Sequence, residues 1–169
     1  MLRRQGLNAR SVQDITRAAA TAGATFDKHF DNKHALATEV MKRYVVATDL
    51  STLRDQQVPP AERLRRHLTS QAERTSSVDY GFGWLTATRA SDNPAPSESA
   101  EFLAQWTEAL ADTIRAGQEA GEITRVHSAE ALATFLIDAL EGSALRARAT
   151  GDPGCAKRTL DAALMALRL

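Results

Sequence analysis

Side chains suited to contact with a polyanion are concentrated near the N-terminus of the chain. Residues 1–47 contain eight Lys or Arg and four Asp or Glu, a net charge of +4, although the 169-residue chain has a formal net charge of zero. A basic segment in an otherwise acidic chain indicates contact with nucleic acid or with a membrane surface at that end.

No combination of residues favours an enzyme. The sequence has no catalytic Ser, His and acid set, no paired-carboxylate motif and no phosphate-binding loop. Gly81 and Gly83 lack the third glycine and the preceding strand of a nucleotide-binding turn. His29 and His34 have no Cys or acidic partners at metal-ligand spacing. We therefore expect no catalytic residues, no metal and no cofactor.

Cysteine usage and hydropathy indicate the cellular compartment of the protein. Cys155 is the only cysteine, so no intramolecular disulfide can form, which favours a reducing compartment. Its thiol is either a redox sensor or an unreactive spectator. The second is favoured because Lys157 and Arg158 are the only basic residues near it in sequence, and a reactive thiol usually has a basic environment. No segment approaches the roughly 18 apolar residues of a membrane span. The prediction is a cytoplasmic protein without a membrane partner.

Helical patterns dominate, and two short helices precede a longer one. Ser11 and Asp14 have the spacing of a capping box at the start of a first short helix. A second short helix covers about residues 22–29 and buries Phe26, and Asn32 is a suitable N-cap for the third. This order is that of a helix-turn-helix, whose second helix enters the major groove of double-stranded DNA.

The rest of the chain is also predicted to be helical. The third helix carries apolar residues at helical spacing as far as Leu53, before the prolines of "QQVPP" stop it. A short helix weakened by glycine is expected in "DYGFGWLTATRAS". Gly121 is a suitable stop and Ser128 a suitable N-cap for two of the long helices. The expected helices cover about residues 60–76, 98–120, 129–149 and 156 to the end.

The helix-turn-helix resembles the DNA-binding segment of the tetracycline-repressor (TetR) family of bacterial transcription regulators. The resemblance is carried by "SVQDITRAA", "TF" at residues 25–26, "HF" at residues 29–30 and "NKHALATEV" at residues 32–40. The later helices, including "EGSALRAR", resemble the effector-binding and dimerisation domain of that family. The resemblance implies an all-α homodimer that binds a palindromic operator, usually as a repressor, and releases it when a small molecule enters the C-terminal domain.

By position in the motif, the resemblance places DNA contacts on the second helix and around it. Lys33 is implied to clamp a phosphate, with a solvated lysine as the alternative, and His29 either contacts a phosphate or packs beside Phe30. Arg10 and Lys28 supply further positive charge. The candidate DNA-binding residues are Arg10, Ser11, Gly23, Ala24, Thr25, Lys28, His29 and Lys33.

Three departures from the family pattern fall in the same segment. The turn has Ala20 and Thr21 where the family usually has Gly and Val, so we expect a strained turn or an extended first short helix. Gly23 and Ala24 stand where the family commonly has Lys and a small residue. Asp27 stands where the family has an aromatic residue, typically Tyr, that reaches a phosphate, and DNA repels a carboxylate there.

The family's first helix is represented here only by "MLRRQG", about its last turn and a half. Either the start of the protein lies upstream of Met1, or the head lacks part of its core. We therefore expect a ligand-responsive DNA-binding regulator, with a helical homodimer that binds a small molecule or partner and has weakened or lost DNA binding as the alternative. The predicted domains are residues 1–47, a helix-turn-helix with an incomplete first helix, and residues 48–169, for ligand binding and dimerisation.

Scarce aromatic residues indicate where a ligand could bind. Five of them lie on two segments joined by "DNPAPS", and an apolar cavity with a few polar groups is the usual composition of a small-molecule site. His67, Arg89 or Gln105 could supply the polar contact, and the alternative is that the aromatic residues form ordinary core. The candidate ligand-binding residues are His67, Tyr80, Phe82, Trp84, Phe102 and Trp106.

The last two helices carry apolar stripes and small residues, which permit close helix approach. Pairing with the same helices of a second subunit would make a four-helix interface. The alternative is that these faces pack only within the subunit. The candidate interface residues are Leu136, Leu140, Ala144, Leu160 and Leu164.

Overall fold

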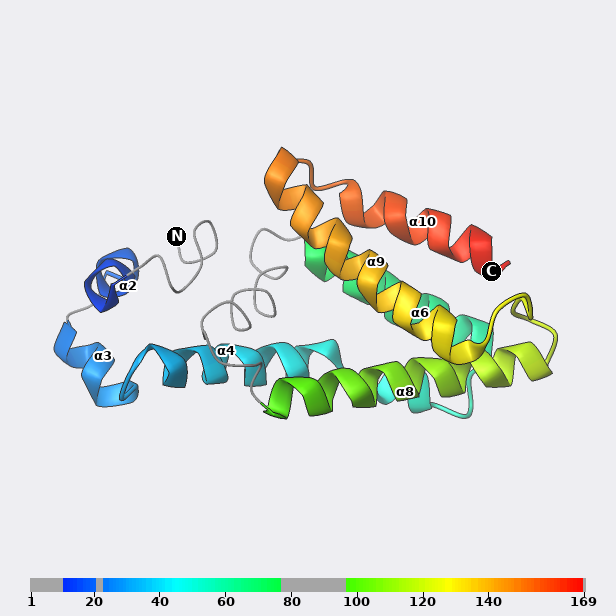
Figure 1. Cartoon of the computed structure of the whole chain (residues 1–169), viewed down its shortest axis with the longest axis horizontal. Coiled ribbons are helices and arrows are strands. Elements are labelled where there is room, and N and C mark those ends of the chain that lie inside the picture. Colours follow the sequence, from blue (N-terminus) through cyan, green and yellow to red (C-terminus); the bar gives the residue numbers. More distant parts are fainter. Residues whose placement is uncertain (1–10, 21–22, 77–96, 169) are drawn as a thin grey trace. The chain divides into compact units, whose positions relative to one another are not determined.

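The computed structural model describes residues 11–20, 23–76 and 97–168, and its regular structure in these ranges is entirely helical (Figure 1). The all-α prediction is thus confirmed for the described residues. Arg10, the incomplete first helix and the "DYGFGWLTATRAS" segment lie outside them. The helices are α2 Val12–Ala18, α3 Gly23–His29, α4 Lys33–Thr48, α5 Ser51–Arg54, α6 Pro60–Ser76, α8 Ser97–Glu119, α9 Ala129–Thr150 and α10 Cys155–Leu167.

The chain forms two compact units. One contains residues 1–47 and 82–100, and the other contains residues 48–81 and 101–169. The first unit therefore holds α2 and α3, the pair predicted to be the helix-turn-helix. The second holds α5, α6, α9, α10 and most of α8.

The capping residues confirm where the N-terminal helices begin. The backbone N–H of Asp14 donates to Ser11 Oγ at 3.2 Å, and the backbone N–H of Ser11 donates to Asp14 Oδ2 at 3.0 Å, which completes the predicted capping box of α2. Asn32 Oδ1 accepts from the backbone N–H of Ala35 at 3.0 Å at the start of α4. Local side-chain acceptors thus satisfy N–H groups that have no partner inside these helices.

The turn after α2 adopts the backbone conformation that a glycine would favour. α2 ends at Ala18, and Ala20 has φ of 51°, in the left-handed region. A Cβ makes this region unfavourable, because it approaches the neighbouring carbonyl group. Of the two expectations for the turn, strain is therefore correct and an extended helix is wrong.

The third predicted helix is interrupted before Leu53. α4 ends at Thr48, Asp49 has φ of 40°, and the short helix α5 starts at Ser51. Asp49 Oδ1 accepts from the backbone N–H of Ser51 at 3.1 Å, an Asx-type bond that stabilises the turn. The apolar periodicity continues through this break, so the pattern could not reveal it.

The second unit has a core made by its long helices. α6 packs against α9 and α10, and these last two helices pack against each other (Figure 1). Gly121, with φ of 75°, follows α8, and Ser128 Oγ accepts from the backbone N–H of Ala131 at 3.2 Å at the start of α9, as predicted. Large side chains that are almost completely buried include Leu64, Leu68, Trp106, Leu110, Ile114, Leu136 and Leu167.

The last helix, α10, begins at Cys155, one residue before its predicted start. The thiol of Cys155 is buried. Of the described helices, none is both long enough and apolar enough to cross a membrane.

Candidate DNA-binding and effector-binding sites

The helix α3 has one buried side and one exposed side. Phe26 packs against Ile15 of α2, with Val12, Phe30 and Leu36 around them, so a small apolar core fixes the two short helices together. Amphipathic helices expose the face that lies opposite such a core. The exposed residues of α3 are Gly23, Ala24, Thr25, Asp27, Lys28 and His29.

The predicted DNA-contacting residues on α2 and α3 lie where a ligand can reach them. Thr25 and Lys28 are exposed, and Ser11 is exposed at the N-cap of α2. The ring of His29 is exposed and also lies 6.5 Å from that of Phe30, so its two predicted roles are compatible. Lys33 is the first residue of α4. The polar face predicted from the motif is therefore present, although DNA contact by these residues stays a prediction.

A negative charge lies within the same exposed surface. Asp27 is exposed and is followed immediately by Lys28. At distances of a few ångströms in water, each carboxylate disfavours a nearby phosphate by an amount similar to that by which each ammonium favours it. The charge of Asp27 thus opposes that of Lys28 on this helix.

In the second unit, three of the six candidate ligand-binding residues form one buried cluster. The Phe102 and Trp106 rings stack with centroids 5.9 Å apart, and the His67 ring meets Trp106 edge-on at 6.0 Å. Trp106 Nε1 donates to His67 Nε2 at 2.9 Å. Tyr80, Phe82 and Trp84 lie outside the described residues. A ligand contact by His67 would replace interactions that its ring already makes.

The protonation state of His67 follows from its surroundings. Burial, together with the positive charge of Arg74, lowers the pKa of His67 from 6.5 to about 4, whereas Asp49 opposes the shift. The imidazole is therefore neutral at pH 7. Its neutral form can accept the Trp106 hydrogen bond through Nε2 and interact with the backbone of Asp49 through the other nitrogen.

Sequence reasoning missed a buried polar stripe along α6, formed by Arg63, His67 and Gln71. The three residues are spaced by four and lie on one side of the helix. Gln71 Nε2 donates to the carbonyl oxygen of Thr48 at 2.8 Å, and Arg63 Nη1 donates to that of Leu53 at 3.0 Å. In the sequence, the only sign of this stripe is that polar residues recur every four positions next to Leu64 and Leu68. The solvent-exposed face of an ordinary helix shows the same spacing.

The stripe connects α6 to both sides of the break between α4 and α5. Gln71 donates a hydrogen bond to the carbonyl oxygen of Thr48, the last residue of α4, and Arg63 donates one to the carbonyl oxygen of Leu53 in α5. Between them, His67 interacts with the backbone of Asp49, the residue that follows α4. A buried carbonyl group without a partner is costly, so these bonds couple the position of α6 to the path of the chain at residues 48–53.

Most of the predicted dimer-interface residues are buried within the subunit. Leu136, Leu140, Ala144 and Leu160 are buried within the subunit, and Leu164 is half-buried. Four of the five predicted interface residues therefore belong to the core formed with α6, which is the alternative that the sequence left open for these faces. Their apolar stripe is occupied by the subunit itself.

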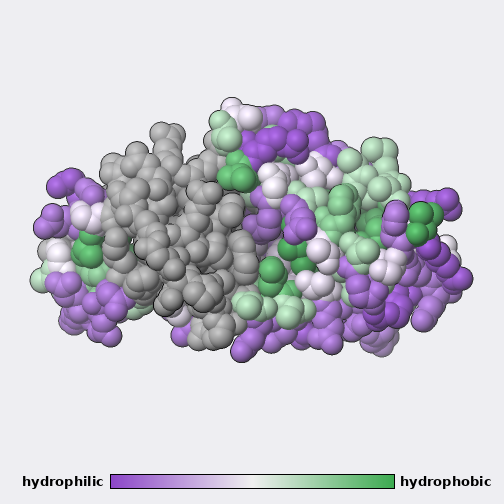
Figure 2. Space-filling model, in the orientation of Figure 1, coloured by the Kyte–Doolittle hydropathy of each residue, from purple (hydrophilic) through white to green (hydrophobic). Residues whose placement is uncertain are grey.

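A different apolar face of α9 and α10 is exposed. Phe135, Leu145 and Met165 are 51%, 49% and 73% exposed, and Gly142 has no atom within 4 Å of the position that a Cβ would take. Figure 2 shows hydrophobic residues over the region formed by α9 and α10. Helical spacing places Phe135, Gly142 and Leu145 on one side of α9. Ala162, Met165 and Ala166 are likewise exposed on α10.

Metal binding finds no support in the described residues, where no three His, Cys, Asp or Glu side chains are grouped to hold an ion. The Cys155 thiol has Asp152 Oδ2 at 3.8 Å and Arg158 Nη2 at 3.5 Å.

Comparison with known proteins identifies relatives that cover most of the chain. Residues 88–163 match the model of the family described as "Tetracyclin repressor-like, C-terminal domain". The HTH-type transcriptional repressor DhaR of Mycobacterium sp. (strain GP1) is 30% identical over 146 residues, which cover 84% of this chain and 74% of that protein.

Solved structures show the same fold. The regulatory protein TetR from Rhodobacter sphaeroides has a TM-score of 0.76 at 21% identity, with 98% of this chain and 92% of that chain covered. A TetR-family transcriptional regulator from Agrobacterium tumefaciens has a TM-score of 0.81 at 20% identity, with 98% and 90% covered. The arrangement of a helix-turn-helix followed by a helical bundle is thus shared with these structures.

Proposed function

This chain belongs to the tetracycline-repressor family of transcriptional regulators, and from that premise we propose that it is a homodimeric repressor, released from a palindromic operator by a small-molecule effector. The observation that carries the proposal is α3, which packs Phe26 against α2 and leaves Thr25, Lys28 and His29 exposed. A helix presented in this way can enter the major groove, where such side chains contact phosphates and base edges.

Operator contact is assigned to the predicted set on and around α3. Thr25 and Lys28 face the DNA, Ser11 at the start of α2 meets the backbone, and Lys33 at the start of α4 clamps a phosphate. Arg10 adds charge next to Ser11. Gly23 and Ala24, with their small side chains, leave room for close approach of the α3 N-terminus to the DNA backbone.

The effector is assigned to the aromatic cluster of the second unit. Phe102 and Trp106 give it an apolar wall, and the neutral His67 holds Trp106 in place. The other three predicted contacts, Tyr80, Phe82 and Trp84, lie outside the described residues. An apolar, aromatic effector suits such a wall better than a charged one, because burial of a charge there has no compensating partner among these residues.

Release of the operator is assigned to the polar stripe of α6. A ligand that displaces Trp106 disturbs His67, and the same helix holds the Thr48 carbonyl through Gln71. Three residues separate α3 from α4, and α4 ends at Thr48, so a shift at Thr48 can be passed along the chain to α3. The ligand acts by binding one arrangement of α4 more tightly than the other.

Dimerisation is assigned to the exposed face of α9 and α10, with Phe135, Leu145 and Met165 as its apolar centre. Gly142 and the small residues of α10 permit close approach of the partner's helices. Two copies of α3 then meet two half-sites of a palindrome. We place this regulator in the cytoplasm, where bacterial operator DNA lies.

Fluorescence anisotropy with labelled DNA duplexes tests the proposal. Duplexes that tile the region upstream of the protein's own gene are titrated with the full-length protein at 50 mM and 200 mM salt, next to a shuffled duplex of equal length. We expect one duplex to bind at least tenfold more tightly than the shuffled one, and more weakly at the higher salt. Equal affinity for all duplexes at both salt concentrations would overturn the proposal.

A further inference from the structure

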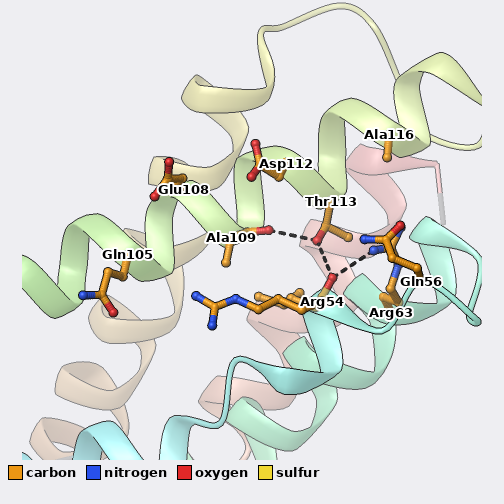
Figure 3. Close-up of a pocket in the computed structure, with 10 residues that line it drawn as sticks. Arg54, Gln56, Arg63, Gln105, Glu108, Ala109, Asp112, Thr113 and Ala116 are labelled. Carbon is orange, nitrogen blue, oxygen red and sulfur yellow. Dashed lines mark hydrogen bonds between the residues drawn. The ribbon is translucent and has the colours of Figure 1, made fainter.

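A polar cleft of about 160 Å³ lies in the second unit between α5, the start of α6 and α8 (Figure 3). None of the residues of the aromatic cluster, His67, Phe102 or Trp106, lines it. It is therefore a separate feature from the proposed effector site. A ligand could bind in this cleft whether or not the chain binds an operator.

The cleft contains a buried cation that forms no ion pair with a described residue. Arg63 lines the cleft and is only 4% exposed. Its Nη1 donates to the carbonyl oxygen of Leu53 at 3.0 Å, and its buried Nε has no hydrogen-bond partner. In the part of the chain that the structure describes, no carboxylate forms an ion pair with this guanidinium. A buried charge is normally paired, because removal from water is costly without a partner.

The hydroxyl group of Thr113, beside Arg63, can exchange one of its hydrogen bonds for a bond to a ligand. Thr113 Oγ1 lies 3.1 Å from the carbonyl oxygen of Leu53 and 2.9 Å from that of Ala109, and its single proton can serve only one acceptor at a time (Figure 3). Arg63 also donates to the Leu53 carbonyl, so that oxygen stays satisfied if the hydroxyl turns to a ligand. Arg63 Nε and Thr113 Oγ1 are thus an N–H donor and an O–H donor buried in the wall of the cleft.

The exposed acids around the cleft disfavour a second negative charge on the ligand. Arg54 also lines it, and Figure 3 shows this side chain extended in the direction of Gln105. Glu108 and Asp112 line it too, both exposed, and Asp112 pairs with Arg115 at 2.6 Å. A second carboxylate on the ligand would meet these acids and be repelled.

We propose that this cleft binds a small monocarboxylate with a short apolar body. The carboxylate pairs with the guanidinium of Arg63, in the bidentate geometry that this group favours, and accepts from Thr113. The apolar body lies against Leu53, Ala109 and Ala116, which also line the cleft. A cavity of 150 Å³ accepts benzene, so a ligand of about six to nine non-hydrogen atoms fits this volume.

Isothermal titration calorimetry of the full-length protein with sodium pentanoate tests this site. Chloride is adjusted so that ionic strength stays constant, and pentanamide and glutarate serve as the neutral and the doubly charged analogues. We expect saturable binding of pentanoate, at least tenfold tighter than that of either analogue. Absence of saturable binding, or equal binding of pentanamide, would overturn the proposal, because the charge of Arg63 would then contribute nothing.

Two variants and one control locate the bound carboxylate. Arg63→Met keeps an apolar stem of similar length and removes the charge, so pentanoate affinity should fall at least tenfold. Arg65→Met, on the exposed part of α6, should bind like the wild type. Unchanged affinity in Arg63→Met would show that the ligand binds elsewhere. Ala116→Leu fills the cleft without changing Arg63, so it provides the same test if Arg63→Met does not fold: retained binding there overturns the proposal.

Discussion

Trp106 and His67 form a hydrogen bond of 2.9 Å between two side chains that are 1% and 2% exposed. The indole nitrogen can only donate, so Nε2 of His67 must carry no proton. The neutral imidazole then keeps its proton on Nδ1. One ring thus joins α8 to α6, and its interaction with the backbone of Asp49 extends the connection to the residue after α4.

His67 makes stability depend on pH. Its pKa, lowered mainly by burial, is about 4 in the folded protein and near 6.5 when unfolded. Between these values the unfolded state binds a proton that the folded state does not, so the free energy of unfolding falls as pH falls. The stabilisation is complete above pH 6.5, and about 3 kcal/mol is lost by pH 4.

Urea unfolding of the wild type and of His67→Gln at pH 7.5 and pH 4.5 measures this dependence. Glutamine keeps an acceptor for Trp106 but does not titrate. We expect the wild type to lose about 2 kcal/mol more than the variant between the two pH values. Parallel losses in the two proteins would contradict the lowered pKa of His67.

Gln71 is expected to stabilise the end of α4. Gln71→Leu preserves apolar packing but leaves the buried carbonyl group of Thr48 without this donor, at a cost of about 1–3 kcal/mol. Ser70→Ala changes an exposed neighbour on α6 and should alter stability by less than about 0.5 kcal/mol. Thermal unfolding of the three proteins checks this, and equal midpoints would mean that the bond contributes nothing.

Helix starts were predictable because their causes are local. Ser11, Asn32 and Ser128 each accept from a backbone N–H three residues later, as their residue types and spacing indicate. The break at Asp49 was not predictable in this way. The apolar pattern continues across it, and the donors that stabilise it come from α6, with Gln71 lying 23 residues after its acceptor Thr48.

The partner of an apolar stripe cannot be deduced from the stripe. Leu136 and Leu140 of α9 have the spacing of an interface, and a second subunit or another helix of the same chain would bury them equally well. The packing of α9 with α6 and α10 decides for the latter. The exposed side with Phe135 and Leu145 is less regular in sequence, since Asp138 interrupts it, so it gives a weaker signal.

The turn of the helix-turn-helix should be improved by a glycine. Ala20 has φ of 51°, and a left-handed conformation costs a residue with a Cβ about 1 kcal/mol. Ala20→Gly should therefore slow amide hydrogen exchange in α2 and α3 by about fivefold. Ala19→Gly is the matched control: with φ of −85° Ala19 has no strain to relieve, so faster or unchanged exchange is expected. If Ala19→Gly slows exchange and Ala20→Gly does not, the backbone strain assigned to Ala20 is contradicted.

The exposed face of α9 and α10 should hold the dimer together. In Gly142→Leu, the new side chain enters open space within the subunit, and the higher helix propensity of leucine stabilises α9 by about 1 kcal/mol. The variant should therefore fold. Its larger side chain should prevent the close approach of a second subunit. Met165→Asp places a charge on the same face. Sedimentation velocity should find dimers for the wild type and monomers for both variants.

Val126→Asp is the control for this face. Val126 is 71% exposed but precedes α9, outside the proposed interface, so its variant should remain dimeric. If Gly142→Leu and Met165→Asp also sediment as dimers, the interface lies on another surface. If all three variants are monomeric, the effect is not specific to this face, and the assignment of the interface is contradicted.

Charge on α3 should control operator affinity in both directions. Asp27→Asn removes a carboxylate from the exposed side of α3, so DNA binding should become several-fold tighter at 50 mM salt, whereas Lys28→Gln should weaken it by a similar factor. Loss of one phosphate contact in Lys28→Gln should also reduce the slope of log affinity against log salt by about 0.9. Lys157→Gln, on α10, should change neither quantity. If Asp27→Asn binds no more tightly than the wild type, Asp27 does not face the DNA, and α3 must lie in the groove with its other exposed residues.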